Sequence, residues 1–461
     1  MDFTKVEPSI QRLQQQLSGS IVTPADADYD QTRRAWDLNF HHYPALILVA
    51  HDAQDVMAGV RFAREAGLGV TVQSTGHGML FPADDNLLII TSRMTGVYVN
   101  AETRIARVEA GALWKHILDQ STPHGLAPLL GSSPHVGVVG YTLGRGIGWL
   151  SRRYGFAADS LRWIDVVTPD GELRRASAVE NSELFWGLRG GGGNFGIVTA
   201  LEFDLYPVAT IYGGDMFYPG EMAGEALRFF REWVKNVPDE MTSSIAILKF
   251  PSLPQIPEPM RDKVQVIVRA AYAGEAADGA ELMQQWLDWH RPTSNSFHEM
   301  PFADIGSIQK DPVEPAAGYG TNEMLDEISD GLIDVIVQYM SDPASPLTFT
   351  ELRHAGGAIE RVAADTNAIT HRDAQFYLNM AGLTPTPETY AAVKAYMPRY
   401  QAAVRRYVKG GVYLNFMKAD DAQKRIGDAY TPAMLERLRA LKAEVVPDNM
   451  FRYSYPLVAA T

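Results

Sequence analysis

A histidine between glycines follows a short alternating segment near the amino end of the chain. Val70 and Val72 lie two residues apart within 69–73, a spacing typical of one face of a β-strand. The next stretch consists of Ser74, Thr75, Gly76, His77 and Gly78. Because glycine lacks a Cβ atom, this backbone could approach a flat, bulky ligand closely, with His77 facing that ligand. A polar turn histidine is the alternative interpretation.

Two more glycine-rich stretches could face the same ligand. The first has glycines at 137, 140, 144, 146 and 148, interleaved with valines. So many glycines make a poor helix and a poor strand, so we expect an irregular, buried backbone whose N–H groups are free to face a ligand. A surface loop is the alternative. The second stretch spans 190–196.

The second stretch contains Gly-x-Gly-x-x-Gly at 191, 193 and 196, a spacing found in nicotinamide-dinucleotide sites. Those sites need a strand before the glycines and a helix after them. Here 182–188 is predicted to be a helix, and 197–206 alternates as a strand. The order is reversed, so the sequence argues against such a site.

The elements that must position these stretches fall into two groups. Residues 45–73 predict a strand, a helix and a strand, and 165–175 predict a hairpin around a Pro-Asp-Gly turn. After about residue 207 glycine becomes rarer and helices alternate with strands, which indicates a second domain whose sheet is covered by helices. Helices are predicted at 226–237, 280–289, 326–340 and 387–408, and strands at 244–250, 264–271, 346–353 and 375–380.

The tail is predicted to return to the first domain. Residues 412–416 alternate as a strand, and Thr431 with Pro432 marks the start of a helix. The chain has 461 residues, more than one hydrophobic core usually serves. We therefore expect domains at 1–206 and 207–409, with 410–461 returning to the first.

Composition excludes several classes of function. With 41 basic and 55 acidic residues the formal net charge is -14, which argues against binding a nucleic-acid backbone or an anionic membrane. The absence of cysteine excludes disulfides, thiolate metal ligands and thiol nucleophiles. The histidines are scattered without a zinc motif, and no calcium loop occurs, so no metal site is expected. Without a signal pattern or a long apolar run, a cytoplasmic, soluble protein is the expectation.

Taken together, these residues resemble the covalent flavoprotein oxidases of the vanillyl-alcohol-oxidase type, in their berberine-bridge-enzyme-like branch. The resemblance covers nearly the whole first domain and the tail. It rests on Pro44 with the following strand, 73–78, 137–148, Tyr154-Gly155 with Asp159, 184–186 with 189–199, Tyr413 with Asn415, and 447–452. It implies an α+β fold, with a two-subdomain FAD-binding domain of the PCMH type and a substrate domain whose sheet is covered by helices.

The resemblance implies that FAD lies between the two subdomains and is bonded covalently to His77. In this family a histidine in that position is linked to the flavin methyl carbon, and a neutral imidazole nitrogen can act as the nucleophile. Many relatives form a second link through a cysteine, but Ser133 occupies that position here, so a single attachment is implied. The implied cofactor-binding residues are Gln73, Ser74, Thr75, Gly76, His77, Gly78, Ser133, Gly137, Val138, Thr142, Gly144, Gly146, Gly148, Gly193, Gly196, Ile197, Tyr413 and Asn415.

Several positions depart from the family pattern. Gln73, Thr75, Arg145 and Val446 replace the usual residues and are expected to affect packing near the cofactor. Relatives that oxidise alcohols and sugars often have a tyrosine that takes the hydroxyl proton, where this chain has Phe416. Phenylalanine cannot accept a proton, so either another group serves or the substrate ionises without help.

Glu351 is the best substitute for that base. It lies on the expected strand 348–354, in the part of the second domain whose sheet covers the flavin in relatives. Arg353 has the same strand parity, so the two could form an ion pair, and a surface salt bridge is the alternative. By family position Tyr141 would line the flavin face.

We therefore expect an FAD-dependent oxidase that takes a hydride from a small organic substrate and passes the electrons to oxygen. The missing tyrosine favours a substrate with an acidic or electron-rich centre, such as a phenolic, polyketide-like or amine compound of secondary metabolism. The alternatives are a flavin dehydrogenase with another acceptor and a flavin-binding protein without turnover. The expected partners are the substrate and oxygen, with neither nucleic acid nor membrane, and the sequence leaves the oligomeric state open.

Overall fold

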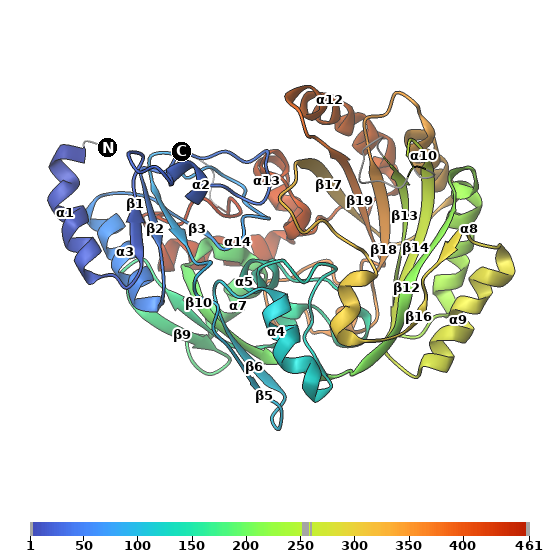
Figure 1. Cartoon of the computed structure of the whole chain (residues 1–461), viewed down its shortest axis with the longest axis horizontal. Helices are drawn as coiled ribbons and strands as arrows, with labels where there is room; N and C mark the ends of the chain where they lie inside the picture. Colours follow the sequence, from blue (N-terminus) through green and yellow to red (C-terminus); the bar gives the residue numbers. More distant parts are fainter. Residues whose placement is uncertain (1–2, 251–257, 259–260, 458–461) are drawn as a thin grey trace.

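The computed structural model describes residues 3–250, 258 and 261–457, and their elements form two adjoining regions (Figure 1). One region contains the amino-terminal elements and the carboxyl-terminal tail. The other contains one large sheet with its helices.

The first sheet of the first region is mostly parallel. Its order is β1-β2-β4-β3, with β1 antiparallel at one edge. Helix α3 connects β2 to β3, and its N-cap Asp52 accepts a hydrogen bond from the Asp55 backbone N–H. The predicted strand, helix and strand are thus confirmed. The strands are β1 Ser20–Val22, β2 Leu46–Val49, β3 Val70–Gln73 and β4 Leu87–Ile90, and the helices are α1 Phe3–Gln16, α2 Tyr29–Thr32 and α3 Ala53–Glu65.

The second sheet is antiparallel throughout, in the order β5-β6-β10-β8-β9. Its last two strands are the hairpin predicted around the Pro-Asp-Gly turn. The strands are β5 Val97–Asn100, β6 Ile105–Glu109, β8 Leu161–Val167, β9 Leu173–Ser177 and β10 Ile197–Asp204. Beside it lie α4 Trp114–Ser121, α5 Val138–Leu143, α6 Ser151–Tyr154, α7 Ser182–Gly191 and the short pair β7 Leu126–Ala127 and β11 Tyr206–Pro207.

Helix α5 corrects one prediction. The stretch 137–148 was expected to be irregular along its length, but its first half is helical and includes Gly140. Val138 and Leu143 are buried in the core of the first region, and this apolar contact stabilises a short helix despite the glycine. The irregular backbone begins at Gly144, where the helix ends.

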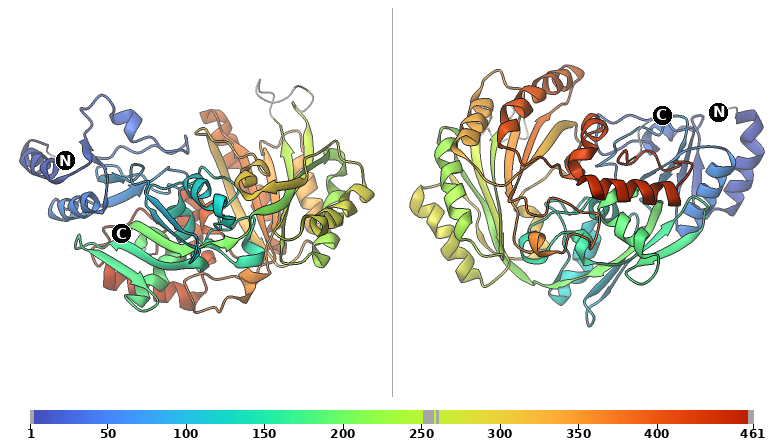
Figure 2. Two further views of the ribbon diagram at one scale, coloured as in Figure 1. Left: turned by 60° about the horizontal axis from the view of Figure 1, so that its bottom comes forward. Right: turned by 180° about the vertical axis from the view of Figure 1, so that it is seen from behind.

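The second region is built on one antiparallel sheet in the order β15-β12-β14-β13-β18-β19-β17, and β16 also pairs with β12. The strands are β12 Thr210–Pro219, β13 Met241–Lys249, β14 Val264–Tyr272, β15 Ser294–Asn295, β16 His298–Pro301, β17 Gly318–Leu325, β18 Phe349–His354 and β19 Phe376–Leu383. The helices are α8 Ala223–Trp233, α9 Ala276–Trp289, α10 Asp330–Ser341, α11 Ala358–Arg361 and α12 Pro387–Val404. Four of them, α8, α9, α10 and α12, pack with one face of the sheet in a single apolar core (Figure 2).

Several element boundaries in this region differ from the predicted ones by a few residues. The helix expected at 326–340 begins at Asp330, because β17 continues to Leu325 and the Ser329 side chain caps the helix by accepting from the Leu332 backbone N–H. Strands β12, β15, β16 and β17 were not predicted. The domain boundaries at 206/207 and 409/410 stay predictions.

The tail returns to the first region, where α14 Pro432–Val445 packs against α7 and α13 Ala419–Arg425 precedes it. The strand predicted at 412–416 is wrong, since this segment forms a 3-10 turn at Leu414–Phe416. Asn322 explains the difference. Its side chain accepts from the Tyr413 N–H at 2.6 Å and donates to the Tyr413 carbonyl at 3.1 Å, in place of a neighbouring strand.

Among the residues that the structure describes, we find no helix long and apolar enough to cross a membrane.

Candidate functional site

His77 lies just beyond β3, at the edge of the first sheet. Gly76 before it has a φ of +81°, and a Cβ atom there would come within 2.7 Å of the Ala35 backbone, so glycine is required. The indole of Trp36 stacks on the imidazole, with ring centroids 4.1 Å apart and 15° between the planes. The Trp36 backbone N–H donates to the Thr75 carbonyl at 3.1 Å. The histidine is therefore held in one orientation by an aromatic face and a tight turn.

The electrostatic surroundings keep this imidazole neutral. Burial lowers the pKa of His77 to about 4, and the nearby Lys418 ammonium adds to the effect, while Asp37 opposes it. Lys418 and Asp37 form an ion pair with each other. The His77 Nδ1 atom lies 2.8 Å from Thr75 Oγ1. At neutral pH a nitrogen lone pair of His77 is thus available for a nucleophilic reaction.

The first two glycine-rich stretches meet. A Cβ atom added at Gly137 would lie 3.1 Å from Ser74 Oγ and 3.7 Å from the Thr75 methyl group. Ser133 is buried near this point, and its Oγ accepts from the His135 backbone N–H at 3.3 Å. The start of the second stretch therefore lies against the first, whereas the shared ligand predicted for all three stretches stays a prediction.

The irregular half of the second stretch is held by the tail. Asn415 donates to the Tyr141 carbonyl at 2.9 Å and to the Tyr413 hydroxyl at 3.0 Å, and that hydroxyl accepts from the Ile147 N–H at 3.0 Å. At Gly144 a Cβ atom would lie 1.9 Å from the Asn415 amide oxygen, so only glycine fits there. Tyr413 and Asn415 thus fix the backbone of this stretch.

Four other predicted residues of this stretch lie in close packing. The Thr142 hydroxyl donates to the Val138 carbonyl one turn earlier in α5 at 2.7 Å. Gly146 has a φ of +78° and leaves no room for a Cβ atom beside the Tyr141 ring, and Gly148 lies against the Leu130 carbonyl. Their positions are set by packing.

The third stretch is connected to the second through the tail. The backbone at Gly192 and Gly193 lies next to Tyr455 and Ser454, and the Tyr455 hydroxyl reaches Asn415 at 3.5 Å. Gly196 and Ile197 are instead packed in the second sheet, where Ile197 pairs with Val167 of β8. These two residues therefore hold the strand, with no open space at Gly196 for a ligand atom.

Three buried polar atoms around the meeting point have no hydrogen-bond partner within the described parts of the chain. They are Ser74 Oγ, Gln73 Oε1 and the Tyr141 hydroxyl. A Cβ atom at Gly78 or Gly140 would meet only open space. A large planar group with many donors and acceptors fits such surroundings, because buried polar atoms need partners and glycines allow its close approach. The residues present therefore fit FAD.

The large sheet contributes the opposite side of the site. Glu351 is fully buried, so the surface salt bridge considered for it is wrong. Its Oε2 lies 2.6 Å from Arg353 Nε and accepts from the Asn379 amide at 3.3 Å, and its Oε1 lies 3.7 Å from Arg269 Nη1. Burial by itself would raise the pKa of Glu351, but the two guanidinium charges outweigh it and hold the pKa below its ordinary value. The predicted ion pair with Arg353 is present.

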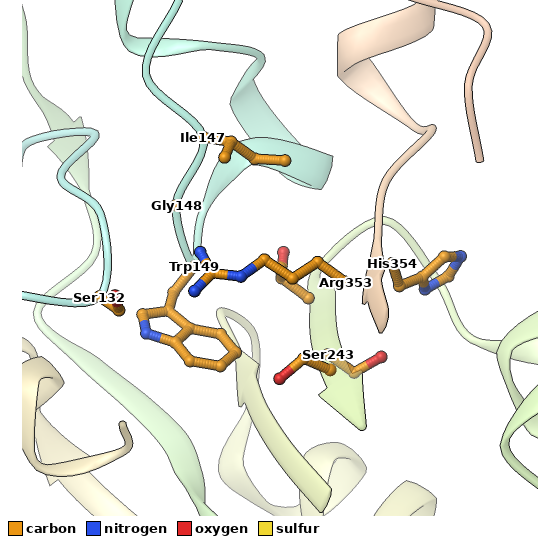
Figure 3. A pocket seen from close by; sticks show the side chains of 9 residues that line it. Ser132, Ile147, Gly148, Trp149, Ser243, Arg353 and His354 are labelled. Carbon is orange, nitrogen blue, oxygen red and sulfur yellow. The ribbon is translucent and has the colours of Figure 1, made fainter. Parts of the chain in front are cut away.

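A small cavity, with room of about 20 Å³, lies between the two regions (Figure 3). Arg353 extends across it from β18 toward Ser132 and Trp149. Ser132, Ile147, Gly148, Trp149, Ser244 and Arg353 are among the residues that line it. The Arg353 guanidinium carbon also lies 5.2 Å from the centroid of the ring of Phe416, the residue that stands where the resemblance implies a tyrosine.

Two charged residues near this cavity were missed in the sequence. Arg269 lies on the predicted strand 264–271, but its approach to Glu351 depends on the register of β13, β14 and β18. Asp311 accepts a hydrogen bond from Ser132 Oγ at 2.5 Å and lies outside any predicted element. Strand parity could have identified Arg269 had the pairing been known, whereas no signal identified Asp311.

No group of three or more His, Cys, Asp or Glu side chains that could hold a metal ion occurs in the described residues.

Comparisons with known proteins find relatives along nearly the whole chain. Residues 44–177 match the FAD-binding domain family. The (R)-6-hydroxynicotine oxidase of Paenarthrobacter nicotinovorans is 26% identical over 460 residues, covering 95% of this chain and 96% of that protein. The carbohydrate oxidase of Microdochium nivale is 28% identical over 468 residues, covering 94% of this chain and 91% of that protein. The structure of BBE-like 1 from Physcomitrella patens, 20% identical, covers 98% of this chain and 100% of its own, with a TM-score of 0.84.

These matches confirm the predicted FAD-binding domain and the resemblance to FAD-linked oxidases of the berberine-bridge-enzyme-like and vanillyl-alcohol-oxidase type. The PCMH-type fold predicted from the resemblance is confirmed as well.

Proposed function

We propose that this chain, an FAD-linked oxidoreductase by its homology with oxidases along nearly its full length, holds its flavin covalently through His77 and oxidises a small polar organic molecule. The observation that carries the proposal is the neutral, stacked imidazole of His77 beside the two converging glycine stretches. When bound, the flavin supplies two-electron oxidation and returns the electrons to oxygen. The residues of this chain bind the flavin and position the substrate.

His77 is suited to form the covalent link because three features act together. The Trp36 ring fixes the plane of the imidazole, and Thr75 holds its Nδ1 atom. The lowered pKa leaves the ring unprotonated at neutral pH. Since cysteine is absent from the whole sequence, we propose a single attachment.

The charged side of the cavity supports a substrate with ionisable groups. Arg353 reaches into the cavity with its charge, and the Glu351 carboxylate holds that guanidinium in place. A guanidinium in a buried cavity favours acidic or electron-rich partners such as a phenol. We propose a phenolic, polyketide-like or amine substrate of secondary metabolism, of which the phenolic and polyketide-like compounds suit the guanidinium best. We also propose a cytoplasmic location.

Glu351 as the proton acceptor stays a prediction. Its lowered pKa makes it a weak base, because the two arginines stabilise its charged form.

Anaerobic mixing with a panel of small molecules tests the proposed function. The panel contains (R)-6-hydroxynicotine, a cello-oligosaccharide and simple phenols, and flavin absorbance is the readout. We expect at least one compound to bleach the flavin and air to restore the colour with release of peroxide. Bleaching without reoxidation in air would indicate another electron acceptor, and no bleaching across the panel would favour a flavin-binding protein without turnover.

A further inference from the structure

Two carboxylates, Glu351 and Asp311, lie near the cavity, and they differ in their partners. Glu351 is in contact with two guanidinium groups and the Asn379 amide. Its negative charge is therefore compensated twice, which leaves little tendency to take up a proton.

Asp311 has a different environment. Its one hydrogen-bond donor within the described residues is the neutral hydroxyl of Ser132, at 2.5 Å. The charged groups that face it are Arg353 and Glu351 from β18 and Arg269 from β14, and the two arginines are already engaged with Glu351. The adjacent Lys310 is paired with Asp215 of β12 at 2.7 Å.

These surroundings make Asp311 take up a proton more readily than an exposed aspartate does. Burial raises the pKa of Asp311, and the Ser132 hydrogen bond and the Arg353 charge reverse only part of that rise. A general base works best when its pKa is near the operating pH. The raised pKa of Asp311 is closer to neutral pH than the lowered pKa of Glu351, so Asp311 is better suited to act as the base.

Ser132 connects Asp311 to the cavity. The Ser132 side chain lines the cavity opposite Arg353, and its hydroxyl binds the Asp311 carboxylate. A substrate held by Arg353 would therefore place its polar group next to the Ser132–Asp311 pair.

From this juxtaposition we propose that Asp311, rather than Glu351, is the residue that accepts the substrate proton, an inference that rests on the proposed oxidase function. The substrate is then an alcohol, phenol or amine whose O–H or N–H group is oriented toward Asp311. Glu351 is a positioning residue, because it holds the Arg353 guanidinium in the cavity.

The step balances in atoms and electrons. A C–H bond of the substrate breaks with its electron pair, which passes as hydride to the flavin, the oxidant of the reaction. The O–H or N–H bond conjugated with or attached to that carbon breaks heterolytically, and its electrons form the new double bond. The proton goes to a carboxylate oxygen of Asp311.

Infrared titration of the oxidised holoenzyme tests the proposal without a substrate. The spectrum of the Asp311→Asn variant is subtracted from that of the wild type, and the pH dependence of the carboxyl band that disappears gives the pKa of Asp311. The spectrum of Glu351→Gln gives the pKa of Glu351 in the same way. We expect the Asp311 pKa above the ordinary aspartate value and above that of Glu351. The reverse order would overturn the proposal. Because this readout needs no turnover, it can fail or succeed independently of the proposed oxidase function.

Ser132→Ala supplies the second readout. Loss of the hydroxyl removes a hydrogen bond to the charged carboxylate, so the Asp311 band should titrate at higher pH than in the wild type. A role for Ser132 in packing alone would leave the titration unchanged, and that result would contradict the proposal. This variant also keeps the test open if Asp311→Asn fails to fold, since flavin content reports folding.

With a compound from the panel that bleaches the flavin, the pH profile completes the test. Asp311→Asn should slow flavin reduction by about 10²–10⁴-fold and remove the acidic limb of the profile. Glu351→Gln should keep the acidic limb and mainly weaken substrate binding. Retention of the limb in Asp311→Asn, together with its loss in Glu351→Gln, would assign the base to Glu351.

Discussion

The two faces of the large sheet carry opposite chemistry on the same strands. On one face Leu352 and Leu378 are buried in the apolar core that the helices cover. On the other face their neighbours Glu351 and Asn379 meet across β18 and β19 in a charged layer that faces the FAD-binding region. Strand geometry alone separates the two sets, because successive side chains point to opposite faces. The apolar face stabilises the fold, whereas the charged face costs stability and forms part of the candidate site.

The charged face contains buried polar atoms that lack hydrogen-bond partners. Within the described chain, Thr242 Oγ1, Arg269 Nε, the Tyr377 hydroxyl and Asn379 Oδ1 are buried without a hydrogen-bond partner, and all four lie on strands of this sheet. An unpaired buried polar group costs roughly 1–3 kcal/mol. Such a concentration is expected where a ligand supplies the missing partners.

Breaking the charged layer should have the largest effect on stability. Glu351→Gln leaves Arg353 and Arg269 buried without their carboxylate, so the free energy of unfolding should fall by about 3–5 kcal/mol. Urea unfolding measures this change. The control is Glu351→Gln combined with Arg353→Met, which should lose less than the sum of the single changes because the pair disappears together. Additive losses would show that the pair is not coupled.

Truncating the apolar face should cost slightly less and leave chemistry unaffected. Leu378→Ala removes a fully buried side chain and should lower the free energy of unfolding by about 2–5 kcal/mol. The rate of flavin reduction per folded molecule should equal that of the wild type. A slower reduction with unchanged stability would contradict the separation of the two faces.

A buried histidine at the end of β18, on the same face as Leu352, should make the stability of this sheet depend on pH. Burial and the nearby Arg152 charge lower the pKa of His354, at the end of β18, well below 6.5. Below pH 6.5 the unfolded chain therefore binds a proton that the folded chain does not, and the free energy of unfolding falls as the pH falls. His354→Gln should reduce this slope, whereas Leu378→Ala should shift stability equally at each pH. If the free energy of unfolding changed equally with pH in the wild type and in His354→Gln, the prediction would be refuted.

Restoring a hydroxyl beside Arg353 should have the smallest effect. Phe416→Tyr places a phenol where the resemblance implies a tyrosine, next to the cavity at which we propose Asp311 as the proton acceptor. Flavin reduction should therefore change by less than about tenfold, compared with the 10²–10⁴-fold typical of a general base. Stopped-flow reduction measures it, and a gain of a hundredfold or more would mean that the wild type lacks a base.

The sequence predicted most of the fold because its patterns are local. The strand, helix and strand of 45–73 and the hairpin of 165–175 follow from periodicity and turn residues, and the structure confirms both. The errors arose where tertiary contacts override local preference. Gly140 is helical because its neighbours pack in the core, and 412–416 is a turn because the Asn322 side chain binds its backbone.

For the same reason, some residues of the candidate site were predicted from the sequence and others were not. His77 and the glycine stretches carry a recognisable pattern, and the ion pair of Glu351 with Arg353 follows from spacing on one strand. Arg269 reaches that pair from another strand, and Asp311 does so from a segment outside the predicted elements. Contacts between distant segments are not encoded in any single stretch, so these residues became visible only in the structure.

One measurement tests the central claim, covalent flavin at His77, most directly. The purified protein is denatured and precipitated with acid, and its peptides are weighed by mass spectrometry beside those of His77→Ala. We expect a yellow wild-type pellet with the flavin mass on the peptide that contains His77, and a colourless pellet for the variant. Free flavin in the wild-type supernatant, or flavin mass on another peptide, would contradict the account.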